Sequence, residues 1–102
     1  MSNEEVIEKM RYIMAHPVRY RIVKLLKEAG DEGLYVNKIA KILGIDRKLV
    51  SYHMLVLLRN DIVVGRYGVR GGPPTDEKGR PVVVAYHKLT QRAKEALKGL
   101  PI

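Results

Sequence analysis

The chain has 102 residues and no cysteine, and its 19 lysines and arginines against 11 aspartates and glutamates give a formal charge of +8. This length holds one domain with a modest core, and the lack of cysteine excludes disulfide bonds and thiolate metal sites. The positive excess predicts a polyanionic partner, either nucleic acid or an anionic membrane surface. No apolar run approaches the roughly 20 residues that a membrane span needs, and the acidic start MSNEEVIEK is unlike a signal peptide. We therefore favour nucleic acid over membrane, and a cytoplasmic location.

The first 30 residues predict two helices that support the rest of the domain. Ser2 followed by Glu5 forms a capping-box pattern, which starts a helix over about residues 3–15. Pro17 begins a second helix that runs to about Ala29, because proline is tolerated in the first turn of a helix but not inside one.

The first predicted helix carries a broad apolar stripe. Its members recur at helical spacing: Val6, Ile7, Met10, Ile13 and Met14. One explanation is packing in the core of the domain, and the other is a seam against a second copy of the chain. For the second alternative, we predict a dimer interface in which residues of the first and last helices take part: Val6, Met10, Ile13, Met14, Leu97 and Leu100.

Residues 36–59 predict two short amphipathic helices joined by a glycine turn. Gly44 can adopt the left-handed conformation that ends the first helix, and Asp46 can cap the free N–H groups of the second. Apolar spacing turns one side of the second helix inward, and the remaining outer face consists of Arg47, Lys48, Ser51, Tyr52 and Leu55. Cationic and hydrogen-bonding side chains on the first turns of an exposed helix are the chemistry of major-groove reading. The segment predicts a helix-turn-helix.

Two β-branched runs, over residues 61–64 and 81–87, predict an antiparallel hairpin over about residues 61–88, and residues 34–36 predict a short extra strand. Residues that break regular structure concentrate between the runs: Gly65, Gly68, Gly71, Gly72, Pro73, Pro74 and Gly79. This long tip region also carries the basic residues Arg66, Arg70, Lys78 and Arg80, together with Asp76 and Glu77, which phosphate would repel. Thr90 then caps a last helix over about residues 90–99.

Helices, helix-turn-helix and basic hairpin follow one another in the order of a winged helix. We therefore predict an α+β, mostly helical fold over residues 1–102, with a β-hairpin wing and terminal helices that serve dimerisation. The sequence resembles the arsenic-repressor-like winged-helix transcriptional regulators, especially their archaeal members. Three segments carry the resemblance: HPVRYRIVKLL, IAKILGIDRKLVSYHMLVLLRNDIVV and YHKLTQRAKEAL. The scarcity of Asn and Gln, together with abundant charge, favours a thermophilic source.

The resemblance implies a homodimer built from the first and last helices, with two recognition helices in successive major grooves, and transcriptional repression. It does not carry over a metal response. Metal sensors of that family use Cys near the recognition helix or His and acidic residues in the terminal helices, whereas this chain has no Cys and no His in its last helix. We expect no metal and no cofactor. Leu55 and Leu58 also stand where many relatives carry Lys or Arg, so they either meet thymine methyls or pack.

The histidines and tyrosines fit structural or binding roles rather than catalysis. We expect His53 to be a packed, hydrogen-bonded imidazole, His16 a helix-entry residue and His87 a strand residue beside the core. Ser51 and His53 lie two positions apart and face different sides of a helix, so they form no catalytic pair, and we expect no enzyme. Tyr52 is interpreted as a phosphate or base contact, whereas the remaining tyrosines of the helical part are assigned to the core or an interface: Tyr12, Tyr20 and Tyr35.

The sequence thus predicts a regulator that binds duplex DNA in a sequence-specific way as a homodimer and acts as a repressor, with no effector indicated. Two alternatives stay open. Winged helices also serve as protein-interaction modules of the transcription machinery, which exposed Leu55 and Leu58 would favour. A structured-RNA binder would use the basic surface but not the groove-shaped helix.

Overall fold

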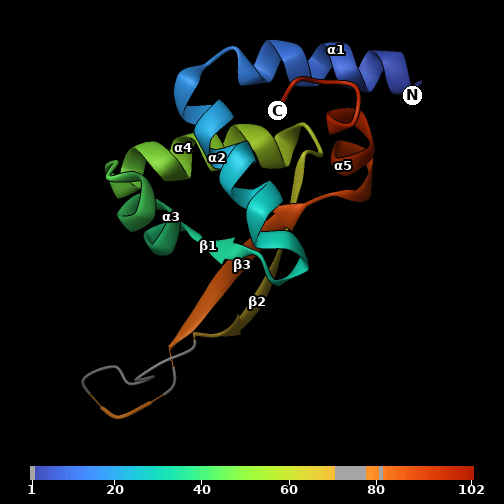
Figure 1. Ribbon diagram of the computed structural model, residues 1–102. Coiled ribbons are helices and arrows are strands. Elements are labelled where there is room, and N and C mark those ends of the chain that lie inside the picture. The colour runs from blue at the N-terminus through green and yellow to red at the C-terminus, as the bar shows by residue number, and fades with distance from the viewer. Residues whose placement is uncertain (1, 71–77, 81) are drawn as a thin grey trace.

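The computed structural model describes residues 2–70, 78–80 and 82–102. A helical body carries a hairpin that projects from one side, with α1 lying across the opposite end (Figure 1). The elements, in chain order, are α1 (Asn3–Met14), α2 (Pro17–Ala29), the 3-10 turn η1 (Gly30–Glu32), β1 (Leu34–Tyr35), α3 (Val36–Leu43), α4 (Arg47–Arg59), β2 (Val63–Val69), β3 (Val83–Leu89) and α5 (Gln91–Leu97). The predicted α+β winged-helix architecture is confirmed.

Side-chain caps define where the helices begin. The Ser2 hydroxyl accepts a hydrogen bond from the Glu5 backbone N–H at 3.2 Å, and Nδ1 of His16 accepts one from the Val18 N–H at 3.2 Å. Each cap satisfies a backbone donor that has no partner within its helix. Both helix starts therefore lie where the sequence predicts them, while α1 ends one residue earlier than expected, at Met14, and α5 ends at Leu97 rather than near residue 99.

The apolar stripe of α1 packs inside the chain itself. Val6, Met10 and Ile13 are buried, with Met10 fully inaccessible to solvent. They belong to the same core as Leu97 and the other buried residues of α5, against which α1 packs. Of the two explanations for the stripe, the structure thus shows core packing for these residues.

The sheet has three antiparallel strands in the order β1-β3-β2. In β2 and β3, Val63 pairs with Leu89 at the root of the hairpin and Val69 pairs with Val83 farther out. The predicted strand bounds, 61–64 and 81–87, are wrong. The first strand begins two residues later because Asp61 adopts a left-handed conformation, with φ of 56°, in the turn that follows α4.

The first strand also continues through two glycines that the sequence assigned to the tip. Gly65 lies opposite His87, and Gly68 lies opposite Val84 beside Tyr86. A Cβ atom on Gly65 would lie 3.3 Å from the His87 ring, and one on Gly68 would lie 3.3 Å from the Tyr86 ring. The glycines therefore leave room for aromatic rings of the partner strand, which is a structural role for glycine within a strand.

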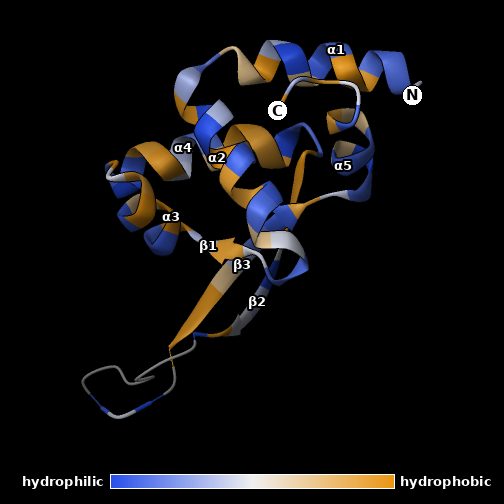
Figure 2. Cartoon of the chain, in the orientation of Figure 1, coloured by the Kyte–Doolittle hydropathy of each residue, from blue (hydrophilic) through white to orange (hydrophobic). Residues whose placement is uncertain are grey.

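Thr90 fastens the root of the hairpin to the helical body. Its backbone N–H donates to the Ile62 carbonyl at 2.9 Å, and its hydroxyl donates to the Asp61 carbonyl at 2.7 Å. The same hydroxyl accepts from the Ala93 N–H at 3.1 Å and so begins α5. Beyond this root, apolar residues continue outward along β3, away from the helices (Figure 2).

Part of the predicted tip lies outside the described residues, namely Gly71, Gly72, Pro73, Pro74, Asp76 and Glu77, and so does Pro81. Within the described ranges, none of the helices combines the length and the apolar composition that crossing a membrane requires.

Candidate nucleic-acid interface

Helix α4 is held by one face and by its N-terminus. Its inner face is buried through Val50, His53, Met54 and Leu57. At its start, the Asp46 carboxylate accepts hydrogen bonds from the backbone N–H groups of Lys48 at 2.7 Å and Leu49 at 3.4 Å. This cap and the buried face fix both the direction and the rotation of the helix.

The turn between α3 and α4 is closed from both sides. Gly44 adopts the left-handed conformation, with φ of 65° and ψ of 36°, and Ile45 donates its N–H to the Ala40 carbonyl at 3.0 Å. From α2, the Arg21 guanidinium donates to the Leu43 carbonyl at 2.9 Å, which satisfies one of the free carbonyls at the end of α3. The predicted helix-turn-helix geometry is therefore present, with α3 packed against α4.

The outer face of α4 brings together every recognition-helix residue that the sequence predicts. All are exposed to solvent: Arg47, Lys48, Ser51, Tyr52 and Leu55. Tyr52 is 61% exposed and Leu55 is 44% exposed. Leu58 is half-buried and packs against the core, so of the two leucines singled out in the sequence, the structure leaves only Leu55 exposed. Leu49, which the sequence analysis did not single out, is also exposed on α4.

His53 lies beneath this face in a stack of rings. Its ring centroid is 4.3 Å from that of His16 and 5.0 Å from that of Tyr52. The expected packing of His53 is present, but the expected hydrogen bond at Nδ1 is wrong, because this buried atom has no partner among the described residues. Burial lowers the pKa of His53 below its usual value, and the nearby His16 and Arg19 lower it further. The imidazole therefore favours its neutral form.

The hairpin presents its cations differently. The Arg66 guanidinium turns toward the protein, donating to the Glu32 carbonyl at 3.4 Å and lying 5.1 Å from the centroid of the Tyr86 ring. The other three predicted wing residues lie farther out: Arg70 at the end of β2, and Lys78 and Arg80 near the start of β3. Lys78 and Arg80 are exposed. Arg66 is therefore less well placed than the other three to contact a distant ligand.

Two cations on α3 were missed by the sequence analysis. Lys38 and Lys41 are exposed and lie three residues apart, while Ile39 and Ala40 between them are buried. In helix-turn-helix complexes, the first helix crosses the DNA backbone. The spacing of these lysines on the outer side of the predicted first helix was a usable signal for a phosphate contact.

The residues expected at a dimer interface separate into two groups. Val6, Met10, Ile13 and Leu97 are buried in the core of the chain and leave no surface for a second copy, which corrects the expectation for these four. Met14 and Leu100 are half-buried and line a surface cavity of about 350 Å³, together with Arg11, Ala15, Tyr20, Pro101 and Ile102. Nearby on α1, Tyr12 is 81% exposed, although the sequence analysis assigned it to the core or an interface.

The fold, with a capped helix whose polar and cationic face is open to solvent, defines a winged helix-turn-helix protein. Residues 14–66 match a family model described as a helix-turn-helix domain, and the chain belongs to that family. The match runs from the end of α1 into β2, so it contains the whole of α3 and α4. Membership of this family indicates a DNA-binding regulator. No curated protein matches the sequence. Among the described residues, no three His, Asp or Glu side chains lie close enough together to hold a metal ion.

Proposed function

We propose that the protein is a transcriptional repressor of the arsenic-repressor-like kind, which binds duplex DNA in a sequence-specific way as a homodimer. One observation carries this proposal. The outer face of α4 gathers two cations, a hydroxyl and a phenol on its first two turns, while the opposite face is locked in the core. Such a face matches the donor and acceptor groups that base pairs display in the major groove.

In this proposal, α4 enters the major groove with its N-terminal turns. Arg47 and Lys48 donate to guanine edges or phosphates, Ser51 and Tyr52 add hydrogen bonds, and Leu55 contacts a thymine methyl. A second set of contacts supplies affinity without reading sequence, from Lys38 and Lys41 on α3 and from the outer wing residues Arg70, Lys78 and Arg80.

The proposed dimer uses the surface that the core of the chain leaves open. Tyr12 projects from α1, and the cavity lined by Met14 and Leu100 lies at the same end of the molecule. An apolar, self-complementary contact there would join two copies about a twofold axis. It would have to place the two α4 helices about 34 Å apart, one turn of DNA, so that both read the same side of the duplex.

Salt dependence of DNA binding tests the proposal at its base. If a dimer neutralises roughly 6–8 phosphates, log K should fall against log salt with a slope of about −5 to −7. Fluorescence anisotropy of labelled duplexes from low to physiological salt measures this slope. Selection from random duplexes should then return a pseudo-palindrome. Binding that is absent at low salt, or that does not change with salt, would overturn the proposal.

Oligomeric state is tested with Tyr12→Glu, because Tyr12 is exposed and its replacement leaves the core intact. We expect light scattering to show a dimer for the wild type at micromolar concentration and a monomer for the variant, with loss of most specific binding. Tyr67→Glu is a matched control, since Tyr67 is equally exposed but lies on the hairpin. A wild-type monomer, or a Tyr12→Glu dimer that binds DNA normally, would contradict the dimer.

A protein-interaction module is the second candidate function. The observation in its favour is a set of exposed apolar side chains on α4 and the hairpin: Leu49, Leu55, Tyr67, Val69 and Val83. These side chains could dock on a protein instead of DNA. The same anisotropy assay separates the candidates, because a protein-docking module would not select a DNA sequence, whereas a structured-RNA binder would prefer a duplex or hairpin RNA competitor.

A further inference from the structure

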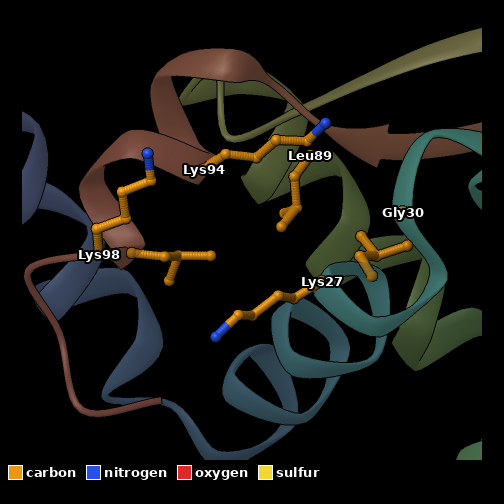
Figure 3. A pocket seen from close by; sticks show the side chains of 7 residues that line it. Lys27, Gly30, Leu89, Lys94 and Lys98 are labelled. Atoms are coloured by element: carbon orange, nitrogen blue, oxygen red, sulfur yellow. The ribbon is translucent and has the colours of Figure 1, made fainter.

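A second cavity lies between α2, the end of β3 and α5, and it shares no residue with the proposed DNA-binding face (Figure 3). Its volume is about 350 Å³, within the range of small-molecule sites. Seven residues line it: Leu26, Lys27, Gly30, Leu89, Lys94, Leu97 and Lys98.

Leucines make up the apolar part of the lining. Leu26, Leu89 and Leu97 come from three different elements and belong to the buried core, so each offers part of its side chain to the cavity from a fixed position. Gly30, which follows α2, contributes no side chain to fill the space. An apolar ligand of a few carbon atoms can therefore replace water against these leucines, which is favourable in proportion to the apolar area covered.

The polar part of the lining is cationic. The side chains of Lys27, Lys94 and Lys98 extend around the cavity from α2 and α5 (Figure 3). Each ammonium already has a partner at the surface: Lys27 donates to the Ile102 backbone oxygen at 3.0 Å, Lys94 pairs with Asp31, and Lys98 lies 3.4 Å from the Glu95 carboxylate. The two carboxylates leave one positive charge in excess. Ion pairs this exposed contribute little stability, so a ligand carboxylate can exchange with them.

We propose that this cavity binds a small amphipathic anion, an organic carboxylate with an unbranched apolar body. The apolar body covers the three leucines, and the carboxylate lies between the ammonium groups of Lys27 and Lys98. Apolar lining with a few charged groups at its edge is the usual composition of such sites. A neutral ligand would forgo the lysines, and a polyanion such as DNA would not fit inside the cavity.

The position of the cavity also indicates what a ligand would touch. Leu89 directly precedes Thr90, whose hydrogen bonds fasten the root of the hairpin, and Leu26 lies on α2, which packs against α4. Control of DNA binding through this site would rest on the proposed function, whereas binding of the ligand does not.

Titration of the isotope-labelled full chain with octanoate, followed by amide chemical shifts, tests the site without DNA. We expect saturable shifts at Gly30, Leu89 and Leu97, and at least fivefold weaker binding of 1-octanol, which has the same chain but no charge. Saturable shifts confined to the other cavity, around Met14 and Ile102, would overturn the assignment. Equal binding of octanol would overturn the anionic class, and the absence of any saturable shift at millimolar octanoate would overturn the site.

The double variant Lys27→Gln, Lys98→Gln should bind octanoate at least fivefold more weakly than the wild type. Lys38→Gln, Lys41→Gln is the matched control, because it removes the same charge from two exposed lysines on α3. Retained dispersion of the amide spectrum shows that each variant is folded. An equal loss in both double variants would mean that net charge, and not this cavity, attracts the anion, and would overturn the proposal.

Discussion

Helix α4 and the β2–β3 hairpin both carry cations toward solvent, but the protein holds them in different ways. The helix has a buried face, with Val50 and Leu57 fully inaccessible, and a capped N-terminus. The hairpin is buried only at its root, through Val63 and Leu89, and farther out Tyr67 is 82% exposed. Side chains on α4 therefore start from positions fixed by the core, whereas those beyond the root of the hairpin depend on the strand pair alone.

This difference assigns different tasks to the two regions in the proposed complex. Reading base edges requires donors placed within a few tenths of an ångström, because hydrogen bonds weaken steeply with distance and angle. Phosphate neutralisation tolerates looser placement, since charge interactions fall off slowly with distance. We therefore expect sequence preference to depend on α4 and general affinity to depend on the hairpin and α3.

The largest expected effect concerns the buried side of α4. Leu57→Ala removes a fully buried side chain, so it should lower the free energy of unfolding by about 2–5 kcal/mol. Val69→Ala on the exposed hairpin should change it by no more than about 0.5 kcal/mol. Urea unfolding followed by circular dichroism measures both. Similar losses at the two sites would show that the hairpin is packed as firmly as the helix.

The next effect concerns the place where β3 approaches the turn before β1. Gly33 has φ of 71° and ψ of −178°, and a Cβ atom there would lie 2.5 Å from the His87 carbonyl oxygen. Gly33→Ala should therefore cost about 2–3 kcal/mol of stability, from backbone strain plus displacement of β3. Gly44→Ala is the control, because Gly44 is also left-handed but has open space around it, and should cost only about 1–2 kcal/mol. If the two variants melt alike, close packing of β3 on this turn is unimportant.

Base preference should separate the two regions directly. Arg47→Ala and Ser51→Ala should change which sequences are selected, with discrimination at the contacted position reduced by about 1–3 kcal/mol. Arg80→Ala should weaken all duplexes nearly alike and reduce the salt slope by about 1 for each phosphate that Arg80 neutralises. Selection followed by binding curves distinguishes these outcomes. Losses that ignore sequence in both sets would show that α4 does not read bases.

The smallest expected effect is the pH dependence that His53 gives to the attachment of α4. Because burial lowers its pKa, the folded protein binds fewer protons at His53 than the unfolded chain between the folded-state pKa and the usual value near 6.5. Its contribution to stability is thus complete above about pH 6.5 and is lost as the pH falls through the folded-state pKa.

His87 on β3 also has a pKa lowered mainly by burial, so His53→Gln should remove only part of the slope of stability between pH 7 and 5. Thermal melts across this range measure the slope. An unchanged slope in His53→Gln would assign the whole dependence to other groups.

The sequence by itself was sufficient for features that depend on neighbouring residues. The bounds of α2, the glycine turn at Gly44, the Asp46 cap and the exposed face of α4 all follow from capping chemistry and helical periodicity, which act within a few residues. The order of these elements was then enough to predict the winged helix.

Features that depend on contacts between distant residues were decided only by the tertiary structure. An apolar stripe has the same sequence pattern whether it faces α5 or a second copy, and only packing shows that Met10 and Ile13 lie in the core of the chain. Gly65 and Gly68 resemble turn residues until His87 and Tyr86 are placed opposite them. Arg66 resembles a DNA contact until Glu32 and Tyr86 are found beside it. In each case the deciding partner is far away in the sequence, so local propensity carries no information about it.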